Sequence, residues 1–240
     1  MISIKNLCKS YEDVRALNGV DMEIRKGELF GLIGANGAGK STLLKIIVGL
    51  LAPDQGEVTV GGVDVLQNPV QARKLIGYSP EEPILYDYLT GREFLEFVGK
   101  LRGMEKDRLD QRIAFLLGEY LLSDKADELI ADYSHGMKQK ISLCAALLPE
   151  PEVLLLDEPT NGLDALTAIR FKQHIRSLCN SGITVVFSSH VLETVEKISD
   201  RVGIIKHGKI VACDTLDALR ESVGGGRTLE DIFIKLVQED

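Results

Sequence analysis

The chain has 240 residues, of which 45% are hydrophobic and 27% are charged, and its formal net charge is −8 at pH 7. A chain of this length and composition can bury a substantial core as one large domain or two small lobes, and its acidic balance argues against a protein that mainly binds the nucleic-acid backbone. No apolar run approaches the ~20 residues of a membrane span, and the N-terminal sequence MISIKNLCKS lacks the features of a signal peptide, so we expect a cytoplasmic protein without a nucleic-acid partner.

The N-terminal third is predicted to contain strands and one helix. Turn residues separate apolar stretches that predict strands over residues 2–7, 19–24 and 28–34 and within 53–62. Between the third and fourth of these strands, a Gly-rich stretch runs into an apolar helix that ends near Gly49. This order of strand, loop and helix is typical of nucleotide-binding α/β proteins.

The character of the sequence changes to helices from about residue 80 to residue 149. Thr90 and Glu93 form a capping-box pattern at the start of the first helix. The predicted helices cover residues 90–103, 107–122 and 135–148. We therefore expect a helical subdomain at about 80–149 that is inserted into the α/β core.

After this insertion, strands and helices alternate again. Strands are predicted over residues 152–158, 183–189, 201–208 and 209–214, and helices over 164–179 and 191–199. The strand sequences VLLL and TVVF are apolar throughout, which is typical of a parallel sheet covered on both faces. The stretch VGGGR at 223–227 predicts a short flexible joint before a last helix at 228–238. We expect a single domain over 1–222 and a short C-terminal helical extension over 223–240.

The stretch GANGAGKS, Gly34 to Ser41, matches the pattern G-x-x-x-x-G-K-[ST] and lies between a predicted strand and a predicted helix. Glycines let backbone N–H groups curl around a β-phosphate, and the helix N-terminus adds positive potential. Lys40 is then expected to reach the β- and γ-phosphates, and the Ser41 hydroxyl to ligate Mg²⁺. A plain Gly-rich turn is the alternative, and the strand–loop–helix context argues against it.

Two carboxylates, Asp157 and Glu158, follow the apolar strand VLLL. They are expected at the carboxyl edge of the sheet, where open α/β folds bind ligands. An apolar run that ends in Asp-Glu is by itself usually a solvated strand end. Together with the Gly-rich loop, however, Asp157 becomes the expected Mg²⁺ partner, directly or through water, and Glu158 the group that polarises the attacking water.

Two further side chains depend on this context. His190 follows the next apolar strand and should lie on the same edge, where a contact with the γ-phosphate is favoured over a role as a helix-start residue. Tyr11 is a single aromatic residue in a polar turn. It is either an edge tyrosine or a ring that stacks on adenine, and the residues alone leave both readings open.

These motifs, in this order, resemble the nucleotide-binding subunit of an ATP-binding cassette (ABC) transporter over nearly the whole chain. GANGAGKST resembles the Walker A motif, VLLLDEPT the Walker B motif with the adjoining catalytic Glu158, and NGLD with Asp164 the D-loop. His190 resembles the switch histidine, and Tyr11 the A-loop aromatic residue, which favours adenine stacking. The resemblance implies that ATP is bound by Tyr11, Gly34, Asn36, Gly37, Gly39, Lys40, Ser41 and Thr42, and that Glu158, His190 and Lys40 are catalytic.

The same resemblance implies the fold. It is an α/β fold with a P-loop NTPase core, an N-terminal antiparallel β subdomain and an inserted α-helical subdomain. The 117 residues between Lys40 and Asp157 (157 − 40 = 117) leave room for that insertion.

Two positions depart from the common family pattern. Glu81 stands where the family's glutamine loop usually has Gln, and its expected roles are Mg²⁺ contact and signalling to the membrane partner. The signature, usually Leu-Ser-Gly-Gly-Gln, begins here at Tyr133 and retains Ser134 and Gly136, while His135 and Met137 replace the first Gly and the Gln. The patterns GYxPEEPxLYxxLT, YSxGMxQK and LEDIF resemble the ABC-2-type exporter branch.

The resemblance further implies a partner and a mechanism. Two ATP molecules are expected in a head-to-tail homodimer or a heterodimer with a paralogue, each bound by Lys40 of one chain and by Ser134 and Gly136 of the other. A separate integral membrane permease should dock around Glu81 to Arg102 and hold the chain at the inner face of the cell membrane. An importer subunit, a non-transport ABC machine and a small P-loop kinase are the alternative functions.

Overall fold

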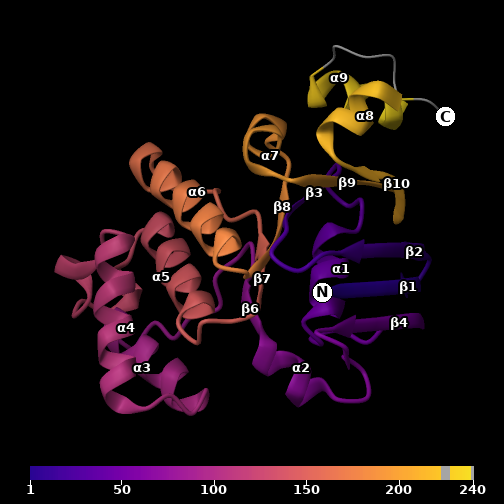
Figure 1. The fold of residues 1–240 in the computed structure, drawn as a ribbon. Coiled ribbons are helices and arrows are strands. Elements are labelled where there is room, and N and C mark those ends of the chain that lie inside the picture. Colours follow the sequence, from indigo (N-terminus) through magenta and orange to yellow (C-terminus); the bar gives the residue numbers. More distant parts are fainter. Residues whose placement is uncertain (223–227, 239–240) are drawn as a thin grey trace.

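The computed structural model describes residues 1–222 and 228–238 (Figure 1), so the joint expected at 223–227 lies outside the described residues. None of the described helices is both long enough and apolar enough to cross a membrane. The chain forms two sheets, with helices packed around the larger one and a separate group of helices at one end.

The smaller sheet is antiparallel and has the order β2-β1-β4-β5. Its strands are β1 (Ile2–Tyr11), β2 (Val14–Ile24), β4 (Gln55–Val60) and β5 (Val63–Asp64). β1 and β2 are longer than predicted because the polar stretch between the two apolar runs continues the pairing as a hairpin. This sheet is the expected antiparallel β subdomain.

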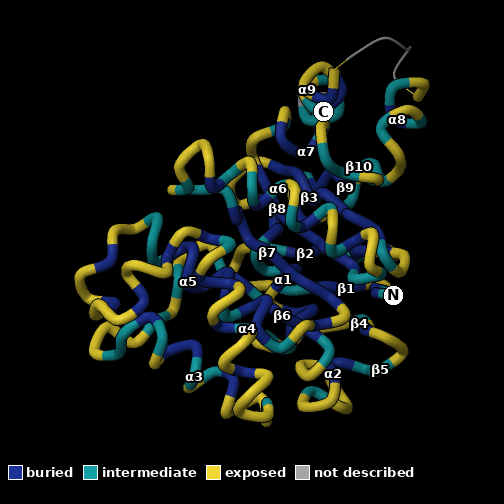
Figure 2. Tube along the Cα trace, turned by 60° about the vertical axis from the view of Figure 1, so that its left-hand side comes forward, coloured by how far each residue is buried: buried dark blue, intermediate teal, exposed yellow. Residues whose placement is uncertain are grey.

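The larger sheet forms the core and has the order β10-β9-β3-β8-β7-β6. Its strands are β3 (Leu29–Ile33), β6 (Ile76–Ser79), β7 (Val153–Asp157), β8 (Thr184–Ser189), β9 (Arg201–Lys206) and β10 (Lys209–Asp214). All but β10 are parallel. Every residue of β3, β7 and β8 is buried, as expected for strands covered on both faces, and Figure 2 shows them inside the molecule.

Helices flank the core sheet and form a separate lobe (Figure 1). The lobe contains α3 (Gly91–Leu101), α4 (Lys106–Glu119) and α5 (His135–Leu147), which lie between β6 and β7 in the chain. The other helices are α1 (Lys40–Ile47), α2 (Pro69–Leu75), α6 (Ala165–Asn180), α7 (Leu192–Ile198), α8 (Leu216–Ser222) and α9 (Leu229–Gln238). The observed architecture agrees with the α/β fold expected from the sequence.

The parallel order of the strands fixes where the functional residues can meet. β3, β8 and β7 are neighbours in register, with Ile33 beside Ser189 and Asp157 beside Ser188. Because parallel strands end at the same edge, the loops that follow these three strands converge there. These loops carry the Gly-rich motif, the two carboxylates and His190.

Candidate nucleotide-binding site

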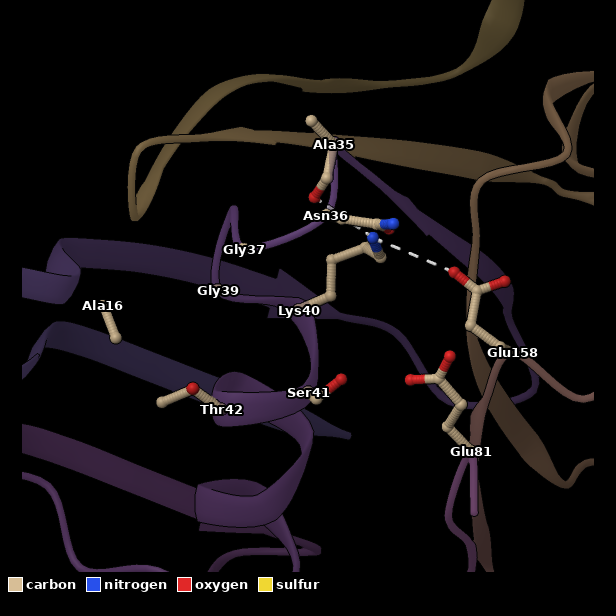
Figure 3. Close-up of a pocket in the computed structure, with 10 residues that line it drawn as sticks. All are labelled: Ala16, Ala35, Asn36, Gly37, Gly39, Lys40, Ser41, Thr42, Glu81 and Glu158. Carbon is tan, nitrogen blue, oxygen red and sulfur yellow. Dashed lines mark hydrogen bonds and ion pairs between the residues drawn. The ribbon is translucent and has the colours of Figure 1, made fainter. Parts of the chain in front are cut away.

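A cavity of about 310 Å³ lies at this edge of the core sheet, against the loop between β3 and α1. Figure 3 shows the lining residues, which are Ala16, Ala35, Asn36, Gly37, Gly39, Lys40, Ser41, Thr42, Glu81 and Glu158. Lys40 and Ser41 come from the start of α1, and the two glutamates face them from the opposite side. The cavity thus combines one cation, a helix N-terminus and two carboxylates.

Glycines are required in the loop for two different reasons. A Cβ at Gly34 would lie 2.5 Å from the Ile205 carbonyl oxygen, so no larger residue fits against β9. Gly39 has φ of 112° and its Cβ would lie 2.5 Å from the Ala16 carbonyl oxygen. These positions hold the backbone in a tight curl before α1, which is the conformation that lets N–H groups face an anion.

No side chain within α1 competes with a ligand for the N–H groups at the start of this helix. Its N-cap, Gly39, makes no side-chain capping bond, and its first turn contains no acidic residue. The first N–H groups of a helix lack partners inside the helix and carry partial positive charge. The N-terminus of α1 can therefore bind phosphate oxygens.

Lys40 places a buried cation at this helix start. Its Nζ donates to the carbonyl oxygens of Gly34, at 2.8 Å, and Ala35, at 3.3 Å, and lies 3.8 Å from Glu158 Oε1. Only 7% of the lysine is exposed. The ammonium is thus held beside the curl of the loop, in a position to bind a phosphate.

The two carboxylates after β7 are ordered by one serine of β8. Ser188 Oγ donates to Asp157 Oδ1 at 2.6 Å and accepts from the Glu158 backbone N–H at 3.0 Å. Both carboxylates are buried, with 2% and 4% exposure. Glu158 has φ of +49°, a left-handed conformation that costs a residue of this type about 1–3 kcal/mol. The strained backbone directs the Glu158 side chain into the cavity.

Glu158 joins Lys40 and His190. His190 Nδ1 lies 2.9 Å from Glu158 Oε2, and the His190 backbone N–H donates to the same oxygen at 3.3 Å. The other oxygen of Glu158 faces Lys40. The structure therefore brings together the three residues that were predicted to be catalytic, Lys40, Glu158 and His190.

The structure places other predicted site residues outside the cavity. Tyr11 lies at the end of β1 and is 45% exposed, while the part of the same hairpin that lines the cavity is Ala16. Ser134 is the N-cap of α5, where it accepts from the Met137 N–H at 3.3 Å, and Gly136 lies in the first turn of that helix. Ser134 is exposed, on the helical lobe.

Asp164 is the N-cap of α6 and also lies outside the cavity. It accepts hydrogen bonds from the Thr167 N–H, at 2.9 Å, and hydroxyl, at 2.7 Å, and from Lys140 Nζ at 2.9 Å. The bonds from Thr167 and the pairing with Lys140 hold the pKa of the Asp164 carboxyl well below its usual range. Asp164 is thus an anion that joins the start of α6 to α5.

Two residues that take part in these contacts were missed in the sequence. Ser188 orders both carboxylates, and its only local signal is that it is a polar residue at the end of an otherwise apolar strand. Lys140 binds Asp164, and its sequence context indicates only that it belongs to the signature helix. Neither partner is close in sequence, so hydrophobic periodicity could not have identified them.

Comparisons with known proteins point to one family. A family model described as "ABC transporter" matches residues 17–161. The linearmycin resistance ATP-binding protein LnrL of Bacillus subtilis (strain 168) is 37% identical over 230 residues, which are 96% of this chain and 74% of the relative. A solved ATP-binding subunit of an ABC transporter superposes with a TM-score of 0.94 at 33% identity, covering 98% of this chain and 99% of that one.

A second solved structure shows a related protein as a dimer. This is the post-hydrolysis state of the ATP-binding cassette MJ0796, bound to ADP and Pi, with a TM-score of 0.84 at 27% identity. The match covers 90% of this chain and 99% of the other.

Proposed function

Since the chain belongs to the ABC transporter family as an ATP-binding subunit, we propose that it powers outward transport by an ABC-2-type exporter through a separate membrane permease. The chain is an ABC ATPase, and ATP hydrolysis is the reaction that drives transport. The catalytic proposal rests on the Glu158 carboxylate at the cavity, whose Oε1 lies near Lys40 Nζ and whose Oε2 lies near His190 Nδ1. The exporter assignment is supported by the resistance function of LnrL and by the exporter-like patterns of the sequence.

The residues of the cavity can divide the chemistry between them. The N–H groups at the start of α1 and the Lys40 ammonium bind the phosphates, and the charge of Lys40 stabilises the negative charge that moves toward the leaving ADP. Glu158 accepts a proton from the attacking water as the water oxygen bonds to the γ-phosphorus and the bond from that phosphorus to the β–γ bridging oxygen breaks. His190 fixes the orientation of Glu158 through its backbone N–H and its ring.

The same cavity suits Mg²⁺ as the cation bound with ATP. Ser41 and Glu81 line the cavity, and Asp157 immediately precedes Glu158 at the end of β7; these residues offer hydroxyl and carboxylate oxygens, the ligands that Mg²⁺ prefers. Asp157 is a buried carboxylate that accepts a hydrogen bond from the Ser188 hydroxyl. In the described part of the chain, no group of three or more His, Cys, Asp or Glu side chains could hold a metal by itself. A cation that takes oxygens from both protein and nucleotide fits this donor set. Bound there, Mg²⁺ would neutralise charge on the β- and γ-phosphates.

The position of Ser134 and Gly136 supports a head-to-tail dimer. Both lie at the start of α5 on the helical lobe, outside the cavity of their own chain. A second copy can bring its α5 N-terminus to this cavity, where the N–H groups and the Ser134 hydroxyl bind the γ-phosphate. The dimeric MJ0796 structure supports this assembly. A homodimer is the form of this assembly that needs no second kind of chain.

The Tyr11 ring stacks on the adenine of the bound ATP.

The segment from Glu81 to Arg102 offers a surface for the permease. Three apolar side chains of this segment are largely exposed: Ile84 at 82%, Tyr88 at 92% and Leu101 at 72%. Ile84 also lines a groove together with residues that include Pro80, Phe94 and Arg102. Docking there places the chain at the cytoplasmic face of the membrane.

The composite site can be tested with mixed dimers that carry Lys40→Ala on one chain and Ser134→Ala on the other. One of the two composite sites then keeps both its Lys40 and its Ser134, so we expect about half of the wild-type ATP hydrolysis. The control places both substitutions on one chain and pairs it with a wild-type chain, which leaves neither site complete. Equal hydrolysis by the two combinations would contradict the shared site.

Export can be tested by purifying the chain from membranes together with its permease. Inside-out vesicles that contain the complex should accumulate the cargo when ATP is added outside, and the Glu158→Gln complex should not. ATP-driven accumulation in right-side-out vesicles with internal ATP, and none in inside-out vesicles, would identify an importer instead. Copurification with ribosomes or DNA and no permease would favour a non-transport machine.

A further inference from the structure

We infer that Lys140 is a positioning residue whose ion pair with Asp164 ties the start of α5 to the loop that follows Glu158. The inference rests on the proposed ATP hydrolysis and dimerisation. The start of α5 is the part of the chain proposed to contact the partner's ATP, and Glu158 is the group proposed to act on the chain's own ATP. The ion pair thereby helps to position the Glu158 of its own chain.

The contact itself is direct and well shielded on the lysine side. Lys140 is only 9% exposed, and its Nζ lies 2.9 Å from Asp164 Oδ2. The other Asp164 oxygen accepts from the Thr167 N–H at 2.9 Å, so the carboxylate also fixes the first turn of α6. The low pKa of Asp164 keeps this group ionised over the whole physiological pH range.

A second contact joins the same two segments independently of charge. A Cβ on Gly136 would lie 2.5 Å from the Gly162 carbonyl oxygen, so α5 and the loop are in backbone contact there. A Cβ on Gly162 would in turn lie 2.7 Å from His135 Cδ2. The start of α5 and the loop at 161–164 therefore pack as one unit.

The loop transmits this position to Glu158 because it is short and hydrogen-bonded. The Asn161 N–H donates to the Glu158 carbonyl oxygen at 3.1 Å, and the Leu163 N–H donates to the Thr160 carbonyl oxygen at 3.3 Å. Glu158 itself has the strained φ of +49°. A shift of Asp164 relative to β7 is therefore expected to change the direction of the Glu158 side chain, and small misplacements of a catalytic group strongly reduce the rate.

The same helix provides a matched control. Lys138 lies two residues before Lys140 and pairs with Asp87, with Nζ 2.9 Å from Asp87 Oδ1. This pair joins α5 to the segment at 80–89 and has no contact with Asp164 among those found in the structure. Lys138→Met and Lys140→Met remove the same charge from the same helix, but only the second breaks the connection to the Glu158 loop.

The first experiment compares four forms of the full chain: wild type, Lys140→Met, Lys140→Arg and Lys138→Met. Lys140→Met should lower kcat for ATP hydrolysis about fivefold, which corresponds to about 1 kcal/mol, because an ion pair with a solvent-exposed partner such as Asp164 contributes up to about that much. Its affinity for ATP as a single chain should be unchanged, since Lys140 does not line the cavity. Lys140→Arg should restore kcat, and Lys138→Met should keep the wild-type kcat of the isolated chain.

Mixed dimers then show through which site Lys140 acts. In one dimer, Lys140→Met and Glu158→Gln are on the same chain, so the remaining active glutamate belongs to the unaltered partner. In the other dimer they are on separate chains, so the remaining active Glu158 is attached to the altered loop. We expect the fivefold loss only in the second dimer, relative to a dimer that carries Glu158→Gln alone on one chain.

The outcomes separate this inference from the proposed function. A loss confined to the first dimer means that Lys140 serves only the signature contact with the partner's ATP, and it overturns the inference. Equal losses in both dimers, failure of Lys140→Arg to restore kcat, or wild-type kcat of Lys140→Met overturn it as well. If the wild-type chain does not hydrolyse ATP, or Glu158→Gln does not stop hydrolysis, the proposed function fails, and the Lys140 comparison is not needed to show it.

Discussion

Replacement of Glu158 by Gln tests the assignment of the catalytic carboxylate with the smallest possible change. Gln has the same shape, so its side-chain oxygen can still accept from the His190 backbone N–H, which now donates to Glu158 Oε2 at 3.3 Å. The substitution removes the negative charge 3.8 Å from Lys40 and the group proposed to take the proton from water. Lys40 keeps its two carbonyl partners, so the cavity should remain formed.

Glu158→Gln should strongly reduce the rate of ATP hydrolysis but should leave ATP binding nearly unchanged. Loss of a positioned general base lowers the rate of hydrolysis by roughly 10²–10⁴-fold. Binding of ATP should persist, because the P-loop and Lys40 are unchanged. At ATP concentrations of about 100 times Kd, binding stabilises the folded chain by about 2.7 kcal/mol. With an unfolding entropy of about 2.1 cal/mol/K per residue, a chain of 240 residues should gain ~5 °C in Tm.

Two assays on the same preparation separate these effects. Steady-state phosphate release gives kcat, and the melting temperature with and without Mg-ATP reports binding. We expect Glu158→Gln to lose phosphate release, to retain the Tm increase, and to accumulate as an ATP-bound dimer in size-exclusion chromatography. A variant that releases phosphate at the wild-type rate would remove Glu158 from its role as base. Loss of both phosphate release and the Tm increase would show that the carboxylate is needed to form the cavity.

Three further predictions address residues outside the cavity. Gly136→Ala should lower ATP hydrolysis by more than about tenfold without changing ATP affinity. The new Cβ would lie 2.5 Å from the Gly162 carbonyl oxygen and would displace the signature from the loop at 161–164. The control Gly118→Ala should keep full activity, because its Cβ would have no neighbouring atom closer than 3.9 Å. Tyr11→Ala should weaken ATP binding by about 1–3 kcal/mol in calorimetry while Tyr11→Phe binds as the wild type, because stacking needs the ring and not the hydroxyl; equal affinity of the two variants would rule out stacking. Asp164→Asn should be less stable than the wild type at pH 7. The difference in Tm should begin to shrink as the pH falls below the ordinary carboxyl pKa of 3.8, and it should be lost only as the pH falls through the lower pKa that Asp164 has in the folded chain. A difference in Tm that does not change with pH would contradict the ion pair.

The sequence predicted the parts of the fold whose signals are local. Apolar runs such as Val153–Asp157 identified buried parallel strands, and the Gly-rich loop identified the turn into α1, because burial and backbone conformation restrict the residues at those positions. α2 and α8 were not predicted. Each of them buries a single residue, Ala72 in α2 and Leu219 in α8, so neither shows a periodic apolar face.

The candidate site was predictable to the extent that its residues follow strands. Asp157 and His190 could be placed at one edge because β7 and β8 are parallel neighbours. The contacts among the side chains could not be read in the same way. The pairing of Ser188 with Asp157 spans 31 residues, and that of Lys140 with Asp164 spans 24. Contacts over such separations depend on how separate helices and strands pack together.

The signature stretch YSHGMKQK shows how packing decides which departures from a family pattern a chain can tolerate. At Gly136 the backbone of the loop approaches so closely that a Cβ would lie 2.5 Å from the Gly162 carbonyl oxygen, which explains why this glycine is retained. His135 is exposed, and its ring lies beside Gly162, where the positive φ of 75° and the lack of a Cβ leave room for it. The position of the motif's first glycine, residue 135 here, therefore accepts a large side chain as long as residue 162 is glycine. A second large residue at 162 would have to displace the His135 ring, so these two positions are expected to limit each other, and Gly162→Ala should reduce hydrolysis less in a His135→Gly background than in the wild type.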